Sequence, residues 1–244
     1  MNRSKASRTK RRSQADSTPR EPRPEPRPGT VTALQSQVHD PDRVSMFIDG
    51  TFAMGIARDV AEAFGLHTGQ VLDEPALAQL TGQETLHRAT ATALTFLAYR
   101  PRSEGEIRQR LRRNEHTDEV IEQVLERLRG WRYVDDADFS RRWIENRAEH
   151  RPRGTRLLSQ ELRAKGVDPN LAAEAIDEAE INELDDALAL ARDRLRQLGG
   201  LDQITRERRL SGFLGRRGYG FDVIRETINQ VRTEEAAGTE PEDD

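Results

Sequence analysis

Two stretches of this chain follow nearly the same pattern: RPRSEGEIRQRLRRNEHTDEVIEQVL at 100–125 and RPRGTRLLSQELRAKGVDPNLAAEAI at 151–176. Adding 51 to the residue number carries Leu111 onto Leu162 and Val120 onto Leu171, so the apolar positions stay in step. Units of this kind stack on one another because none of them can bury its apolar faces alone. The repeat therefore predicts an array of similar units rather than one globular core.

Each unit is predicted to hold one long helix and two further helices. In the first copy Ser103 and Glu106 form a capping box that starts a helix over 104–113, and Thr117 caps the next helix. A third copy follows about 52 residues after the second, because Leu162 maps to Leu214 and Gly166-Val167 reappears as Gly218-Tyr219. We expect the long helices over 84–99, 136–149 and 181–198.

The segment before the repeats has a different period. In RVSMFIDGTFAMGIA, residues 43–57, apolar residues alternate on both sides of Asp49-Gly50, which is typical of a β-hairpin with a type I′ turn. Short helices are expected near 58–64 and 74–80. The predicted fold is mainly α, three tandem three-helix repeats in an elongated curved array. The expected divisions are a disordered basic Pro/Arg-rich arm at 1–40, a β-hairpin with short helices at 41–82, repeats at 83–132, 133–180 and 181–232, and a disordered acidic tail at 233–244.

Composition narrows the class of protein. Charged residues make up 34% of the 244-residue chain, the formal net charge is -4 and there is no cysteine, so disulfides and thiolate chemistry are excluded. No apolar run approaches the roughly 20 residues of a membrane span, and the basic N-terminus lacks the apolar segment of a secretory signal. We expect a soluble cytoplasmic protein, monomeric and without a membrane partner.

No pattern in the sequence indicates catalysis. None of the five histidines lies four residues from another, and there is neither a Gly-rich phosphate loop nor a Ser nucleophile elbow. The pair Asp135-Asp136 is interpreted as the cap of a helix beginning near 136 rather than as a catalytic dyad. The sequence therefore predicts no enzyme, no cofactor and no metal site.

Charge at the repeated corners favours a binding role. The RPR element occupies the same place in two successive units, so stacking would line up cations that could follow a phosphate backbone or an acidic protein groove. The alternative is that these are solvated helix faces. The helices at 104–113 and 117–129 have helix–turn–helix spacing, which is typical both of DNA-binding proteins and of helical repeats. The aromatic residues near helix ends could stack on bases, although we expect most of them to lie in the core. The candidate contact residues are Arg100, Arg102, Arg108, Arg112, Arg142, Arg147, Arg151, Arg153, Arg156 and Lys165.

Four motifs, in order, resemble the RecX family of bacterial RecA regulators: LAYRPRSEGEIRQRL, GWRYVDDADFSRRWIENR, LLSQELRAKGV and LSGFLGRRGYGFDVI. The hairpin segment and GLHTGQVLDEPALAQL are also similar to that family's N-terminal part, so the resemblance covers roughly residues 43–232. The combination that carries it is Arg102, Ser103 and Glu106 with Tyr133, Asp135, Asp136 and Phe139.

The resemblance implies three three-helix repeats and a protein with no chemistry of its own. It implies binding in the groove of the RecA–DNA filament and restraint of RecA's recombinase, ATPase and co-protease activities, in DNA repair, homologous recombination and the SOS response. DNA would be bound weakly or through RecA. The third copy has Arg208-Arg209-Leu210 in place of RPR. Two alternatives stay open: a helix–turn–helix-like nucleic-acid-binding regulator that acts without RecA, and a plain helical scaffold.

Overall fold

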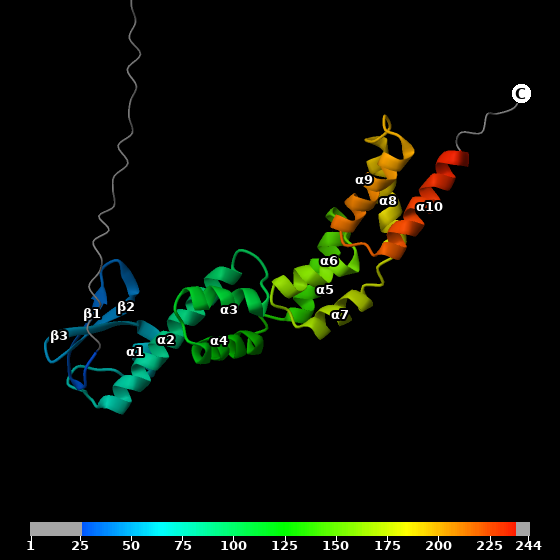
Figure 1. The fold of residues 1–244 in the computed structure, drawn as a ribbon. Helices are drawn as coiled ribbons and strands as arrows, with labels where there is room; N and C mark the ends of the chain where they lie inside the picture. The colour runs from blue at the N-terminus through cyan, green and yellow to red at the C-terminus, as the bar shows by residue number, and fades with distance from the viewer. Residues whose placement is uncertain (1–25, 238–244) are drawn as a thin grey trace, which may run out of the picture. The chain divides into compact units, whose positions relative to one another are not determined.

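The computed structural model describes residues 26–237, which form two compact units, and the division between them falls within one helix, between Glu84 and Thr85. The first unit contains a four-stranded antiparallel sheet with the strand order β3-β2-β1-β4 (Figure 1). Its strands are β1 (Gly29–Gln37), β2 (Asp40–Ile48), β3 (Thr51–Ala57) and β4 (Val71–Leu72).

The predicted hairpin is confirmed as β2 and β3. Asp49 and Gly50 have φ angles of 49° and 76°, the two positive values that a type I′ turn requires. Met46 and Ile48 are buried, as the alternation predicts. The two strands pair in register through Met46 and Met54.

The expectation that residues 1–40 are unstructured is wrong for 29–40. These residues form β1 and the start of β2, and Val31 on β1 is fully buried. A two-stranded hairpin is marginal in water, and β1 supplies the third strand. The sequence signal is the end of the proline-rich run at Pro28, after which threonines alternate with Val31 and Ala33. The arm at 1–25 lies outside the described residues.

Two helices accompany the sheet, and one differs from the prediction. Helix α1 (Arg58–Ala63) is where we expected it. The helices expected at 74–80 and 84–99 are one continuous helix, α2 (Glu74–Leu97), so the expected division at 82/83 falls inside it. Gly82 costs this helix only about 1 kcal/mol relative to alanine. Burial of Leu80 before it and Ala89 after it stabilises the helix on both sides.

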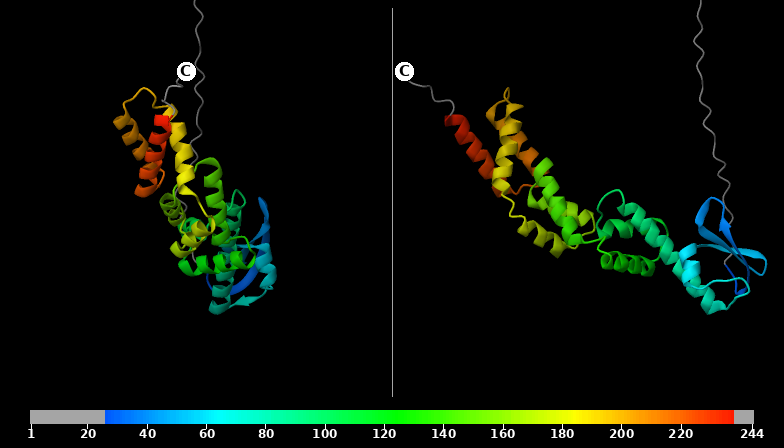
Figure 2. Two further views of the ribbon diagram at one scale, coloured as in Figure 1. Left: turned by 90° about the vertical axis from the view of Figure 1, so that its right-hand side faces the viewer. Right: turned by 180° about the vertical axis from the view of Figure 1, so that it is seen from behind.

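The second unit contains the three predicted repeats. The C-terminal part of α2 packs with α3 and α4, α5 with α6 and α7, and α8 with α9 and α10, and the last three helices lie side by side in every view (Figures 1 and 2). The bounds are α3 (Glu104–Arg113), α4 (Asp118–Gly130), α5 (Asp136–His150), α6 (Thr155–Ala164), α7 (Pro169–Glu178), α8 (Glu183–Arg196), α9 (Gln203–Arg216) and α10 (Phe221–Ala237).

Equivalent positions in the three repeats have the same structural role. Leu111, Leu162 and Leu214 are each fully buried, one in each of three separate apolar clusters. The predicted caps also form, since the Thr117 and Asp168 side chains accept hydrogen bonds from the first turns of α4 and α7. The mainly helical fold with three three-helix repeats is confirmed. The elongated curved arrangement stays a prediction.

The C-terminal prediction needs one correction. Residues 233–237 were expected in a disordered tail, but they continue α10. Val231 of this helix is buried against α8 and α9, and Glu234 and Glu235 beyond it pair with Arg192 and Arg206 of those two helices. Residues 238–244 lie outside the described part. Within residues 26–237, no helix is both long and apolar enough to cross a membrane.

Candidate interaction site

The first RPR corner connects α2 to α3 and contacts the second repeat. Ser103 Oγ accepts a hydrogen bond from the Glu106 backbone N–H (3.2 Å) and donates one to the Lys165 carbonyl oxygen (2.6 Å). Gly105 packs so closely that a Cβ there would lie 2.5 Å from the same carbonyl. The corner is therefore a joint, here called the first joint, between the start of α3 and the turn that follows α6.

Glu106 is the electrostatic centre of the first joint. Its carboxylate lies 2.8 Å from Arg100 Nη2, 2.9 Å from Lys165 Nζ and 3.8 Å from Arg102 Nη1. Burial by itself would raise the pKa of Glu106, but hydrogen bonds from Arg100 and Lys165 outweigh it and hold the pKa below its ordinary value. The predicted capping box forms only in part, because Glu106 binds these cations rather than the Ser103 backbone.

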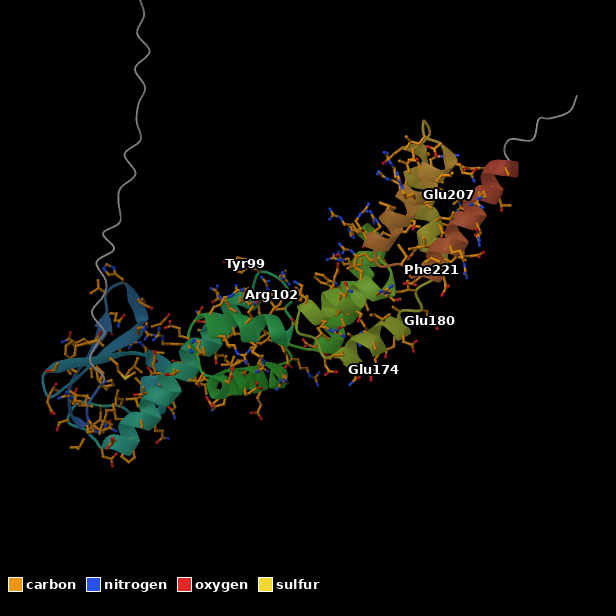
Figure 3. The ribbon with its side chains drawn as sticks, viewed as in Figure 1. Tyr99, Arg102, Glu174, Glu180, Glu207 and Phe221 are labelled. Carbon is orange, nitrogen blue, oxygen red and sulfur yellow. The ribbon has the colours of Figure 1, made fainter. Side chains whose placement is uncertain are left out.

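Arg102 is held by packing as well as by charge. Its guanidinium lies 3.8 Å from the centre of the Phe96 ring, and only 15% of its side chain is exposed. Burial, followed by the charge of Arg100, lowers the pKa of Arg102. Tyr99, three residues earlier in the turn that follows α2, is 83% exposed (Figure 3). The corner therefore places one aromatic side chain in solvent and uses one arginine as part of its interior.

At the second RPR corner, between α5 and α6, the charged side chains form ion pairs within the second repeat. Arg147 and Arg153 both pair with Glu161, and Trp143 Nε1 donates to the same carboxylate (2.8 Å). Arg147 also lies over the Trp143 ring, 4.1 Å from its centre. Arg151 is exposed and pairs with no carboxylate among residues 26–237.

A second joint links the second and third repeats through backbone atoms. Gly154, the equivalent of Ser103, donates its N–H to the Arg217 carbonyl oxygen (2.9 Å), and a Cβ on Gly154 would overlap the carbonyl of Gly218. Arg217 Nη1 reaches back to the Pro152 carbonyl oxygen (3.3 Å). Lys165 and Arg217, 52 residues apart, thus play corresponding parts in the two joints.

The remaining candidate cations differ in how far they are neutralised. On α3, Arg108 pairs with Glu122, and Arg112 Nε lies 2.9 Å from Asp118 Oδ1. Arg142 Nε on α5 lies 2.8 Å from Asp138 Oδ2. Arg156 on α6 is exposed and has no carboxylate partner among residues 26–237.

Sequence divergence explains why Arg163, which corresponds to the paired Arg112, has no carboxylate partner on α7. Pro169 and Ala173 stand where the first repeat has Asp118 and Glu122, so α7 offers no acid there. Arg163, the equivalent of Arg112, lines an open hollow of about 700 Å³ together with Arg156, Asp177 and Glu180. Arg156 has no charged equivalent in the first repeat, where Gly105 takes its place. The same helix face is therefore charge-paired in the first repeat and open in the second.

The residues of the second motif have mixed roles. Asp135 caps α5 by accepting from the Ala137 and Asp138 N–H groups, as expected, and Phe139 is buried. Asp136 accepts a hydrogen bond from the Glu104 N–H (2.8 Å), and burial raises its pKa. Tyr133 is 60% exposed.

The expectation that most aromatics near helix ends are core holds for only part of the set. Tyr219 is buried, and Trp143 and Phe213 pack against core clusters. Tyr99, Trp131, Tyr133 and Phe221 are between 51% and 83% exposed, and Figure 3 shows Phe221 at the start of α10. Within residues 26–237, no group of three or more His, Cys, Asp or Glu side chains is placed to hold a metal ion.

Comparison with known proteins supports the repeat assignment at every unit. Models of the RecX N-terminal domain and of the first, second and third RecX three-helix domains match residues 29–73, 89–128, 135–176 and 181–228. These matches cover more than half of the chain. The chain belongs to the RecX family. The N-terminal match begins at Gly29, the first residue of β1, and so includes the strand that the sequence analysis missed.

Relatives and solved structures of the family agree with this assignment. The chain is 27% identical over 213 residues to the regulatory protein RecX of Bacillus licheniformis, covering 87% of this chain and 81% of that one. It is 36% identical over 163 residues to that of Amycolatopsis mediterranei, covering 64% and 93%. A crystal structure of a regulatory protein RecX superimposes with a TM-score of 0.65 at 24% identity, covering 82% and 98%, which shows a shared fold.

Proposed function

We propose that this chain is a non-enzymatic regulator that binds the RecA–DNA filament and inhibits the recombinase, ATPase and co-protease activities of RecA. It would act in the cytoplasm, in DNA repair and recombination and in the SOS response. The observation that carries the proposal is the match of all three helical repeats to RecX, a family whose curated members are named regulatory proteins.

The charge arrangement favours binding over chemistry. Glu106 and Glu161 are the two most heavily engaged carboxylates of the corners, and each is occupied by cations of this chain. Efficient general acids and bases have pKa values near the operating pH, whereas hydrogen bonds from Arg100 and Lys165 lower the pKa of Glu106. The two carboxylates stabilise connections between and within repeats, and a regulator that spans several subunits of a filament would depend on such connections.

The proposed contact surface is narrower than the full set of candidate cations. Eight of the ten pair with carboxylates of this chain, which reduces the charge that each offers to a partner. Arg151 and Arg156 are exposed and have no such partner among residues 26–237. We assign the strongest contacts with an anionic partner to these two.

The helix–turn–helix alternative receives less support. In a helix–turn–helix protein the second helix enters the DNA groove, and α4 carries four acidic residues against two arginines. If it were correct, the chain alone would footprint a specific DNA sequence, with an affinity that falls steeply as salt rises.

The test adds the purified chain to RecA on single-stranded DNA and follows ATP hydrolysis and strand exchange. We expect both to fall at stoichiometric amounts, and unchanged rates would contradict the proposal. A variant carrying Arg151→Glu and Arg156→Glu should bind the filament more weakly with its helical content unchanged. The matched control carries Arg88→Glu and Arg113→Glu, which make the same change in charge at exposed positions elsewhere.

A further inference from the structure

The connection between α4 and α5 exposes two large aromatic side chains next to each other. Trp131 is 51% exposed and Tyr133 is 60% exposed, and their ring centres are 6.2 Å apart with the planes at 80°. Such exposure is unusual in a chain with only 5% aromatic residues. We call Trp131, Arg132 and Tyr133 the aromatic turn.

The corresponding turn in the second repeat shows which side chains are not required to form the aromatic turn. The turn after α7 has the same backbone path: Ala179 ends the helix with φ -74° and Glu180 follows with φ 45°. At the aromatic turn, Trp131 has φ -83° and Arg132 has φ 59°. Because alanine serves at the helix end in one copy, tryptophan is not needed there to form the turn.

Charge also differs between the two turns. Arg132 is exposed, whereas Glu180 occupies its place in the second repeat. Arg127 lies one helical turn before Trp131, on the same face of α4, and is exposed. Neither arginine pairs with a carboxylate among residues 26–237. The first copy therefore combines free cations with exposed rings, and the second has neither.

Four carboxylates line the hollow beside Arg132, and two of them pair with other arginines. Glu104 pairs with Arg129, and Asp138 lies 2.8 Å from Arg142 Nε. Asp135 and Asp136 accept hydrogen bonds from backbone N–H groups. None of the four forms an ion pair with Arg127 or Arg132, so both exposed guanidinium groups can contact a partner outside the chain.

We propose that the aromatic turn is a contact site for single-stranded nucleic acid, in which Trp131 and Tyr133 stack on bases and Arg127 and Arg132 contact phosphates. Rings beside cations are the combination that binds unpaired strands without reading sequence. A duplex hides the faces of its bases, so the site favours single strands. This extends the proposed function by assigning a DNA contact, and it is measurable with no RecA present.

Tryptophan fluorescence offers a direct test with the full-length chain. The chain has two tryptophans, and Trp143 is held between Phe139 and Arg147 with its indole N–H bound to Glu161. We expect a poly(dT) oligonucleotide to quench the fluorescence of the wild type. It should leave the fluorescence of Trp131→Phe, which retains only Trp143, almost unchanged. Equal quenching in both proteins would overturn the proposal.

Affinity gives a second readout, by anisotropy of a labelled poly(dT) oligonucleotide at low salt. The double variant Trp131→Ala with Tyr133→Ala should bind about tenfold more weakly, and Trp131→Phe should lose less because it retains a ring. Arg127→Gln with Arg132→Gln should flatten the salt dependence by about 0.7 in log–log slope for each phosphate that the protein no longer neutralises. Tyr99→Ala and Phe221→Ala, at aromatic residues that are more exposed than Trp131 and Tyr133, are controls that should bind like the wild type.

Two outcomes would overturn the assignment. One is a wild type that does not bind poly(dT) at low salt. The other is a double variant with unchanged poly(dT) affinity but weaker binding to RecA filaments, which would make the aromatic turn a protein contact. A wild type that binds poly(dT) but does not inhibit RecA would contradict the proposed function and leave this site in place.

Discussion

The two joints of the helical array occupy the same place in successive repeats and are built differently. At the first joint, the Ser103 hydroxyl donates a hydrogen bond to the Lys165 carbonyl oxygen. The Glu106 carboxylate forms ion pairs with three cations. At the second, Gly154 replaces Ser103, and its backbone N–H makes the contact with Arg217. Both joints have close backbone contact, at Gly105 and at Gly154, and the first joint adds a cluster of side-chain charges to it.

The difference predicts different sensitivities. A joint held by charge responds to pH and to loss of an ionisable group, because its energy is electrostatic. A joint held by close backbone contact responds to added volume, because packed backbone has no rotamer through which to yield. The substitutions below separate the two, beginning with the core that the repeats share.

Leu162→Ala should cause the largest loss, about 2–5 kcal/mol in the free energy of unfolding, because this leucine is fully buried in the second repeat. Leu111→Ala and Leu214→Ala, at the equivalent positions, should fall in the same range. Urea denaturation followed by circular dichroism measures all three. A loss below about 1 kcal/mol at any of them would break the equivalence of the repeats.

Gly154→Ala tests the second joint and should destabilise by about 1–3 kcal/mol, because the new Cβ overlaps the Gly218 carbonyl. The same denaturation assay applies. Gly82→Ala is the control, since a Cβ there meets nothing within 4 Å and α2 should gain up to about 1 kcal/mol of helix propensity. If Gly154→Ala is as stable as the wild type, the second joint is looser than described.

Glu106→Gln tests the charge of the first joint. We expect a loss of about 1–2 kcal/mol, because Arg100, Arg102 and Lys165 would be left close together without a counter-charge. Glu126→Gln, on an exposed face of α4, should stay within about 0.5 kcal/mol of the wild type. Equal effects of the two substitutions would show that the cations around Glu106 are solvated rather than held.

The smallest effect is the pH dependence of the same joint. Because the folded-state pKa of Glu106 is lowered, its contribution is complete above its unfolded pKa of about 4.3 and is lost as pH falls through the folded value. The stability difference between wild type and Glu106→Gln should therefore shrink below about pH 4. Asp136, whose pKa is raised, acts in the opposite direction but equally in both proteins. A difference that stays constant down to pH 3 would contradict the assignment.

The sequence predicted the repeated helices well because their signals are local. Caps such as Thr117 and Asp168, and the turn at Asp49-Gly50, act on residues within one helical turn or one strand. Where sequence reasoning failed, a distant partner decided. Strand β1 depends on pairing with β2 and β4, and α2 continues through Gly82 because apolar side chains on both sides of it are buried.

The same distinction between local signals and distant partners applies to the candidate site. The sequence placed the arginines at corresponding corners, but it could not show that Lys165 would meet Glu106, 59 positions away, or that Glu161 would occupy Arg147 and Arg153. The aromatic turn was visible only as residues that could stack on bases or lie in the core. Its exposure, and its contrast with the turn at Glu180, came from the structure.

The sequence by itself determined the number of repeats, the start of most helices and the apolar positions that each repeat buries. These follow from spacing along the chain, which neighbouring residues enforce through helix geometry and capping. Only the tertiary structure decided which charges neutralise one another and which stay available to a partner. Ion pairing depends on distances across the fold, and those distances exist only after the helices have packed.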